Sequence, residues 1–336
     1  MNSFIKKNWF VSLLVVVFAV ISVYYIYDSN KGKLKGKTAN GEGVVYSING
    51  EDVTATGLYD SMYKNNGTAA LAEAITRAVA DQAVETTDLM KDNAASQSTS
   101  ILNNYLSTYG SDYRTTLDAQ LQGLGYAGTD ELEAYLINYF KQSELTAQYA
   151  EQHYDDLKIR NVSYILIKFE DGNSGEGTPT EDEQARMDAV DEALASGKTF
   201  EEAAAEFSED ASTASNGGVL GTLDANTTTL DSAFQQASLS LKEGEISDWV
   251  YSENFGYFLI QCNASTPEGL EAFYRAQNGL TEDIEISKAG IYDSLLSSYD
   301  TTLVNQAIWD TAEELGISFT DPDTEAAVKQ YLGLED

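Results

Sequence analysis

The sequence predicts an α+β protein in which a small antiparallel sheet with surrounding helices is inserted in a mainly helical chain, after one N-terminal transmembrane helix. Three observations support this prediction. One apolar segment lies near the N-terminus, helical periodicity extends over both outer parts of the chain, and the composition becomes strand-like at Ile159. A length of 336 residues is enough for about two domains.

The apolar segment covers residues 9–27 (WFVSLLVVVFAVISVYYIY) and contains no charged residue. As a helix it would span about 28 Å, which is close to the hydrocarbon thickness of a bilayer. Aromatic residues at both ends suit the two interfaces, and no small-residue cleavage site follows. We therefore expect a tail over 1–8, an uncleaved anchor over 9–27 and a Gly- and Lys-rich linker over 28–43.

Charge and rare residues exclude several classes of function. The chain has 20 Lys and Arg against 54 Asp and Glu, a net charge of -34. Phosphate binding needs clustered cations, so nucleic acid is excluded as a partner. Cys262 is the only cysteine and His153 the only histidine. Internal disulfides, His-based triads, and thiolate or His-rich metal sites are therefore excluded, and we expect no metal and no cofactor.

Residues 44–158 are expected to form an N-terminal helical region. It opens with VVYSINGEDVT, a short strand, an Asn49-Gly50 turn and a second extended piece. Helical periodicity then runs to about His153. It is clearest after Thr129 or Asp130, either of which could cap the helix. Apolar residues recur at three- and four-residue spacing and make one apolar face of this helix: Leu132, Leu136, Tyr139 and Phe140.

Residues 159–265 are expected to form the α+β domain. NVSYILIKF (161–169) has the composition of a buried strand. Two capping boxes, Thr180 with Glu183 and Thr199 with Glu202, predict two helices. A glycine-rich loop, FSEDASTASNGGVLGTL (207–223), separates them from a short helix at LDSAFQQA and from strands at ISDWVY (246–251) and GYFLIQC (256–262).

Residues 266–336 are again helical, with a short extended piece at ISF (317–319) and a last helix ending at KQYLG. We expect this C-terminal region to pack with the N-terminal helical region.

Four segments of the middle domain resemble, in order, the parvulin-type peptidyl-prolyl isomerases. VSYILIKF is similar to the family's first strand, Ala-Ser-His-Ile-Leu-Val-Lys, and GKTFEEAAAEFSED to its helix Gly-x-x-Phe-x-x-Leu-Ala-x-x-x-Ser-x-Asp. SNGGVLGTL resembles the loop ending Gly-Gly-Asp-Leu-Gly. LKEGEISDWVYSENFGYFLI resembles Leu-x-x-Gly-x-Ile-Ser followed by Phe-Gly-Tyr-His-Ile-Ile. Most of the chain after residue 43 resembles the PrsA-like extracellular foldases of Gram-positive bacteria, which embed a parvulin domain in a helical chaperone domain.

The resemblance implies the site residues. Two are catalytic candidates, and four would bind the substrate proline: Asp210 and Tyr164; Leu220, Leu230, Phe234 and Phe258. Asp210 matches the acidic or thiol residue beside the rotating bond, and Leu220 matches the loop leucine that packs on the proline ring. Without the resemblance, these apolar residues would be read as ordinary core, and that alternative stays open at this point.

Three positions depart from the family pattern. Tyr164 and Phe258 stand where the family has histidines, and Val219 replaces the loop aspartate. Prolyl isomerisation breaks no bond, but it must overcome a barrier of about 18–20 kcal/mol to rotation about a partial double bond. A dry apolar pocket could lower that barrier without proton transfer. Tyr164 can still donate a hydrogen bond and Phe258 cannot, so the sequence leaves activity undecided.

Two functions from different classes follow. In the first, the protein is a membrane-anchored extracytoplasmic foldase that isomerises Xaa-Pro bonds of secreted proteins. In the second, the parvulin-like domain is inactive and the protein is a holdase for unfolded secreted clients. The acidic loop FEDGNSGEGTPTEDEQ (169–184) disfavours phosphorylated substrates.

The expected partners are unfolded or newly secreted proteins with Xaa-Pro bonds, the membrane through residues 9–27, and a second copy of the chain. The resemblance implies a single-pass protein of the cell membrane with its large domain outside. Loop charge points the other way, because four lysines follow the apolar segment: Lys31, Lys33, Lys35 and Lys37.

Overall fold

The computed structural model describes residues 37–169, 177–298 and 302–334. The chain divides into two compact units, one ending at Gly67 and the other beginning at Thr68. The expected anchor over 9–27 lies outside the described residues. Among the residues that are described, no helix is long and apolar enough to cross a membrane.

The first unit is a small antiparallel sheet followed by helix. Its strands are β1 (Thr38–Ala39), β2 (Glu42–Ile48) and β3 (Glu51–Thr54). Asn49 and Gly50 join β2 to β3, both with positive φ (52° and 87°), which is the backbone of a tight hairpin turn. Helix α3 (Ala55–Met62) follows, with Thr54 Oγ1 accepting from Gly57 N, and a π-helical turn η1 (Tyr63–Gly67) ends the unit.

The second unit is mainly helical outside its sheet. Before the sheet lie α4 (Thr68–Ala83), α5 (Asp88–Tyr109), η2 (Gly110–Asp112), α6 (Tyr113–Gly123), η3 (Thr129–Glu131), α7 (Leu132–Gln152) and α8 (Tyr154–Leu157). After it lie α12 (Pro267–Asn278), α13 (Lys288–Ile291), α14 (Asp293–Ser298), α15 (Thr302–Glu314) and α16 (Pro322–Leu332). A mainly helical chain with a small antiparallel sheet is what the sequence predicts.

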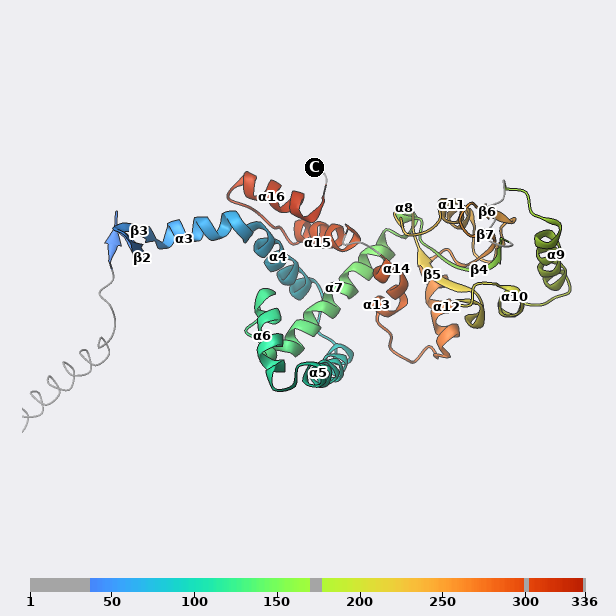
Figure 1. Cartoon of the computed structure of the whole chain (residues 1–336), viewed down its shortest axis with the longest axis horizontal. Helices are drawn as coiled ribbons and strands as arrows, with labels where there is room; N and C mark the ends of the chain where they lie inside the picture. The colour runs from blue at the N-terminus through green and yellow to red at the C-terminus, as the bar shows by residue number, and fades with distance from the viewer. Residues whose placement is uncertain (1–36, 170–176, 299–301, 335–336) are drawn as a thin grey trace, which may run out of the picture. The chain divides into compact units, whose positions relative to one another are not determined.

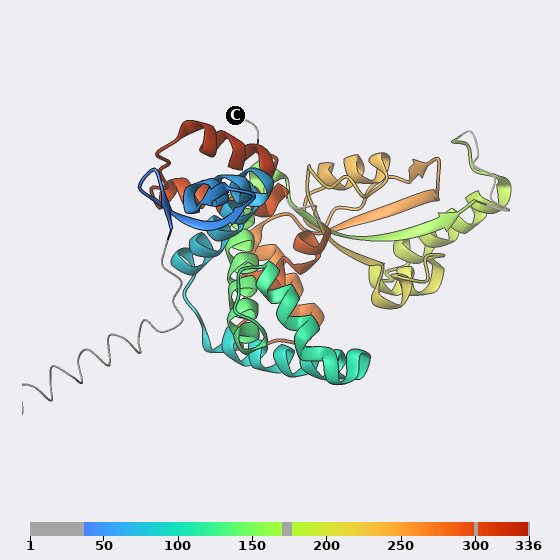
Figure 2. The same ribbon diagram turned by 60° about the vertical axis from the view of Figure 1, so that its left-hand side comes forward.

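Helices from the two ends of this unit pack together. Val79 and Leu145, from the N-terminal helices, share a buried cluster with Ile308 of α15. Ala72 of α4 shares another with Trp309 and Val328. Figures 1 and 2 show α15 and α16, coloured red, beside the blue helix α4. Burying apolar faces against each other stabilises helices that have little stability in isolation.

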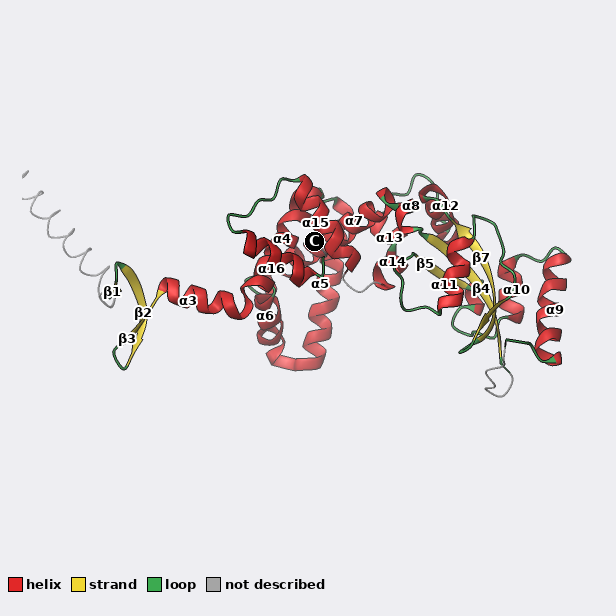
Figure 3. Cartoon of the chain, turned by 90° about the horizontal axis from the view of Figure 1, so that it is seen from above, coloured by secondary structure: helices red, strands yellow, loops and turns green. Residues whose placement is uncertain are grey.

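The middle of the unit holds a four-stranded antiparallel sheet of order β5-β4-β7-β6. Its strands are β4 (Arg160–Lys168), β5 (Val219–Leu223), β6 (Val250–Ser252) and β7 (Gly256–Ala264). Both faces are covered, which explains why β4 is almost continuously apolar. Figure 3 shows α11 (Ser232–Ser240) on one side of the sheet and α9 (Glu181–Ala195) and α10 (Phe200–Phe207) on the other.

Both predicted capping boxes are confirmed. Thr180 accepts from the backbone of Glu183 and Thr199 from that of Glu202. Each glutamate accepts in return from the backbone of its threonine. These reciprocal bonds satisfy backbone N–H groups that have no partner within the helix, and so fix where α9 and α10 begin.

Four local predictions need correction. Val219–Leu223 belongs to strand β5, not to the loop, because it pairs with β4. The strand predicted over 246–251 is limited to β6 (Val250–Ser252), with an isolated bridge from Ile246 to Gln261. Residues 317–319 form no strand. Thr129 and Asp130 do not cap α7. They lie in a 3₁₀ turn, and the backbone and hydroxyl of Thr129 donate to Asp118.

The sheet is joined to the surrounding helices by one continuous core. Ile159 before β4 and Ala264 at the end of β7 share it with Tyr154, Leu270 and Leu295, from α8, α12 and α14. At the outer strand, the backbone N–H of Thr222 donates to Ser294 Oγ at 2.7 Å. The C-terminal helical segment is therefore packed directly against the edge of the sheet.

Candidate functional site

The two positions without the family's histidines lie on the same face of the sheet. Tyr164 of β4 pairs with Ile260 of β7, and Leu166 with Phe258, so Tyr164 and Phe258 are diagonal neighbours on adjacent strands. Because side chains alternate along a strand, both point to the face that α11 covers. The odd-numbered residues of β4, Ile165 and Ile167, point to the face covered by α9 and α10.

On the α11 face, three aromatic rings form a closed group. The ring centroids of Tyr164 and Phe234 are 5.5 Å apart, those of Tyr164 and Phe258 5.6 Å, and those of Phe234 and Phe258 5.0 Å, all edge to face. Each of the three side chains is at most 7% exposed. Leu220 and Leu230 pack against the apolar cluster that contains this aromatic trio, and they remain partly exposed. Together they form an apolar surface with a buried floor and an accessible rim.

A carboxylate is held at the edge of the aromatic trio. The hydroxyl of Tyr164 donates a short hydrogen bond to Asp210 Oδ2, and Asp210 Oδ1 accepts from Ser212 N at 3.0 Å and from Ser212 Oγ at 2.6 Å. Burial alone would raise the pKa of Asp210, but the hydrogen bonds from Ser212 and Tyr164 outweigh it and hold the pKa below its ordinary value. Asp210 is therefore ionised at neutral pH.

The same contacts keep the tyrosine neutral. Burial, and then the hydrogen bond to Asp210, raise the pKa of Tyr164 to about 12. At neutral pH the pair is thus a neutral phenol donating to a carboxylate. Neither partner changes protonation near pH 7.

Asp210 is positioned by the two residues before it, which bind the edge of β4 where β5 no longer pairs. Leu166 N donates to Ser208 Oγ at 3.2 Å, and Glu209 N donates to Leu166 O at 2.8 Å. Lys168 N then donates to Glu209 Oε2 at 2.7 Å. The Ser-Glu-Asp sequence therefore continues the sheet's hydrogen bonding and places the carboxylate beside Tyr164.

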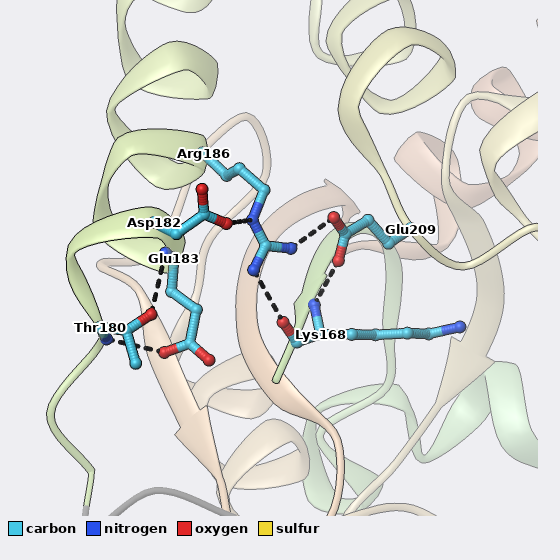
Figure 4. A network of polar contacts seen from close by, with 6 residues as sticks. All are labelled: Lys168, Thr180, Asp182, Glu183, Arg186 and Glu209. Atoms are coloured by element: carbon cyan, nitrogen blue, oxygen red, sulfur yellow. Dashed lines mark hydrogen bonds and ion pairs between the residues drawn. The ribbon is translucent and has the colours of Figure 1, made fainter. Parts of the chain in front are cut away.

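An arginine from α9 holds this segment from the other side. Arg186 lies between Asp182, Glu209 and the carbonyl of Lys168, as Figure 4 shows. Its Nε lies 3.2 Å from Asp182 Oδ2, and its Nη1 donates to Glu209 Oε1. The contact with Asp182 is an ion pair and the bond to Glu209 is charge-assisted, and both lie on the face opposite the aromatic trio, so Arg186 positions the segment without contacting the candidate site.

The glycine-rich loop approaches the same strand closely. Tyr164 N donates to Gly218 O at 2.8 Å. Gly218 has φ +75°, and a Cβ there would lie 2.3 Å from the carbonyl oxygen of Tyr164. Only glycine fits this approach. The loop needs a glycine so that Leu220 can reach the aromatic trio.

Comparison with known families identifies this region. Residues 164–264 match the family model described as "Rotamase: PPIC-type PPIASE domain". This part of the chain is a PPIC-type domain. The match spans β4 to β7 and therefore contains all six candidate residues.

Curated relatives of the chain are named "Foldase protein PrsA". The chain is 30% identical over 128 residues to the one from Clostridium botulinum (strain 657 / Type Ba4), covering 38% of this chain and 34% of that protein. It is 28% identical over 165 residues to one from Clostridium kluyveri, covering 47% and 44%. The matched segments span less than half the length of these relatives.

Solved structures with similarity to the chain include two PrsA proteins. The peptidylprolyl isomerase PrsA from Bacillus cereus is 19% identical, with 86% of this chain and 98% of that chain covered and a TM-score of 0.38. PrsA from Bacillus subtilis is 23% identical, with 84% and 97% covered and a TM-score of 0.31.

The structure brings all six predicted residues together. Tyr164, Leu220, Leu230, Phe234 and Phe258 belong to one apolar cluster, and Asp210 is bonded to Tyr164. Sequence reasoning missed Ser212 and Glu209, which orient the carboxylate. The available signal was their place in the sequence, with Glu209 directly before Asp210 and Ser212 two residues after it. It also missed Arg186, for which the sequence offers no signal, because its helix contacts the segment only in the folded chain.

Proposed function

We propose that the protein is a foldase that assists the folding of secreted proteins, and that its PPIC-type domain catalyses prolyl cis-trans isomerisation. The observation that supports this most directly is the Tyr164–Asp210 pair at the edge of the aromatic trio, with Leu220 and Leu230 on the accessible rim. The match to the PPIC-type family and the relatives named foldase point to the same activity.

In this proposal the apolar residues bind the proline ring, and the polar pair acts on the bond that rotates. Amide resonance, which gives the bond its barrier of about 18–20 kcal/mol, places negative charge on the carbonyl oxygen. The Asp210 carboxylate beside that oxygen would disfavour the planar resonance form more than the twisted state. Tyr164 fixes the carboxylate by its hydrogen bond, and the buried floor excludes water.

A second function is favoured by a separate observation. The rings of Tyr164, Phe234 and Phe258 contact one another and are nearly inaccessible, so aromatic packing occupies the positions where the family has histidines. A domain built this way could hold its shape without catalysis. The protein would then be a holdase that binds unfolded secreted clients.

The cellular setting is also proposed. We place the chain in the cell membrane through residues 9–27, with the large part outside and with newly secreted Xaa-Pro proteins as partners. The domain boundaries 44–158, 159–265 and 266–336, and assembly as a homodimer, remain predictions. Protease treatment of intact cells tests the orientation, since complete protection of the large part would contradict it.

Isomerisation of unphosphorylated Xaa-Pro peptides by the full chain in mild detergent tests the main proposal. Aggregation of an unfolded client is measured in parallel, with Phe234→Ala and Leu220→Ala as variants. A rate above buffer that falls in both variants supports catalysis at this site. Suppressed aggregation without any rate supports the holdase.

A further inference from the structure

A groove runs beside the candidate site, between the outer strand of the sheet and the C-terminal helical segment. It has a volume of about 580 Å³, within the range of ligand-binding clefts. Val219, Leu220 and Gly221 of β5 line one side of it. Phe273 and Gln277, one helical turn apart on α12, line the other side.

The walls of this groove are held together by the fold. Thr222 N donates to Ser294 Oγ at 2.7 Å, which ties α14 to β5. Gly221 has φ +119°, and a Cβ there would lie 2.7 Å from Ser294 Cβ, so the close contact requires glycine. Leu270 and Ile291, which also line the groove, belong to the core that joins the sheet to the helices. The groove is therefore a fixed surface of the second unit.

The chemistry of the groove differs from that of the chain as a whole. The protein has a net charge of -34, yet Asp293 is the one charged side chain among the described residues lining the groove. The exposed residues Asn216 and Gln277 carry amides and line the groove with the partly buried rings of Phe273 and Tyr274. Amides can hydrogen-bond a peptide main chain, and aromatic rings pack on uncharged side chains. The surface suits an extended, uncharged stretch of polypeptide.

Leu220 connects the groove to the candidate site. It packs against the apolar cluster that contains the aromatic trio, and it also lines the groove. We propose that the groove binds the client residues that flank the isomerised proline, so that α12 and α14 extend the peptide-binding surface of the PPIC-type domain. This inference rests on the proposed function, because it assumes that the proline lies at Leu220.

The test compares the affinities of a short and a long peptide for the full chain in mild detergent. The short peptide is an uncharged tetrapeptide with one Xaa-Pro bond, and the long one is an uncharged dodecapeptide with the same bond at its centre. Dissociation constants come from fluorescence anisotropy of labelled peptides, which requires no catalysis. We expect the dodecapeptide to bind at least five-fold more tightly.

Gln277→Trp fills the groove from an exposed position, and Ala276→Trp is its matched control, because Ala276 is the exposed neighbour on α12 outside the groove. We expect Gln277→Trp to abolish the advantage of the dodecapeptide without changing tetrapeptide affinity, and Ala276→Trp to retain it. An unchanged advantage in Gln277→Trp, or equal affinities in the unmodified chain, would overturn the inference.

The outcome is separable from that of the proposed function. If the groove variant removes the length advantage but no isomerisation is measured, the groove proposal stands and catalysis fails. If isomerisation is measured but Gln277→Trp binds both peptides like the unmodified chain, catalysis stands and the groove proposal fails.

Discussion

The same strands form both faces of the central sheet, but the side chains on the two faces are packed differently. On the α9/α10 face, Ile165 and Ile167 pack with Val190 and Phe200 in a cluster that is buried throughout its centre. On the α11 face, Tyr164 and Phe258 form an aromatic floor with partly exposed leucines at its rim and a carboxylate at its edge. Alternation along β4 separates a face that stabilises the domain from a face that could bind a substrate.

The comparison teaches that Tyr164 and Phe258, at the two positions where the resemblance expects histidines, are closely packed. The rings of Tyr164 and Phe258 pack with Phe234, and the tyrosine hydroxyl keeps a polar partner in Asp210. Buried polar groups need such partners, because an unpaired one costs about 1–3 kcal/mol. On the α9/α10 face, by contrast, the buried hydroxyl of Tyr257 has no such partner among the described residues.

The largest expected effect is on the α9/α10 face. Ile165→Ala should lower the free energy of unfolding by about 2–5 kcal/mol, because Ile165 is fully buried and its loss leaves a cavity. The free energy of unfolding is measured by denaturant titration. Unfolding is followed by the fluorescence of Trp249, which packs against this cluster. Ile246→Ala, at a position 42% exposed, is the control. Reduced peptide affinity in the folded Ile165→Ala protein would contradict the separation of the two faces.

Tyr164→Phe should cost about 1–2 kcal/mol, toward the lower end for a hydrogen bond to a charged group, because Asp210 keeps Ser212 as a partner. The pKa of Asp210 should rise in this variant. Because the pKa of Asp210 is lower in the folded protein than in the unfolded chain, ionised Asp210 stabilises the fold at pH values above the unfolded pKa of about 4. This stabilisation is lost as the pH falls through the folded pKa. The difference in stability between Tyr164→Phe and the unmodified protein should therefore shrink in acid, as unfolding curves at pH 7 and pH 3 would show. A constant difference would argue against the bond.

Leu220→Ala should reduce peptide isomerisation about ten-fold, equivalent to about 1.4 kcal/mol in the barrier, with a smaller loss of stability because Leu220 is partly exposed. Leu239→Ala is the matched control, since Leu239 is also partly buried against the same cluster. Equal losses of rate in both variants would mean that Leu220 is ordinary core.

Thr199→Ala should cost about 1 kcal/mol through loss of the capping box of α10, with no effect on peptide binding by the folded protein. Thermal unfolding measures the cost, and Thr180→Ala at the start of α9 should behave alike. A clear loss of peptide affinity would show that the start of α10 influences the α11 face.

The smallest expected effect is that of pH on the rate. The domain has no histidine, Asp210 titrates below its ordinary range and Tyr164 at about 12, so the rate should be flat from about pH 5.5 to 9. Tyr164→His should introduce a titration near the ordinary imidazole value of about 6.5. A bell-shaped profile in the unmodified protein would show that another group takes part.

Local patterns in the sequence were sufficient to predict several elements. The capping boxes at Thr180 and Thr199 depend on residues three apart, and the apolar run of β4 marks a strand covered on both faces. The resemblance of four ordered segments placed six side chains in one site, and the fold brings all six together.

Tertiary structure decided the rest. Val219–Leu223 looks like loop because it follows Gly217 and Gly218 and contains Gly221, but pairing with β4 makes it a strand. Thr129 has the residue type of a helix cap, but it lies in a 3₁₀ turn before α7 and its hydroxyl donates to Asp118 instead of accepting from the helix. Arg186 and Glu209, which are hydrogen-bonded, lie 23 positions apart in the sequence. Ser294 and Thr222 of β5, which are also hydrogen-bonded, lie 72 positions apart. The sequence by itself determined the elements whose hydrogen bonds and apolar spacing are local, whereas only the folded chain decided contacts between segments that meet through packing.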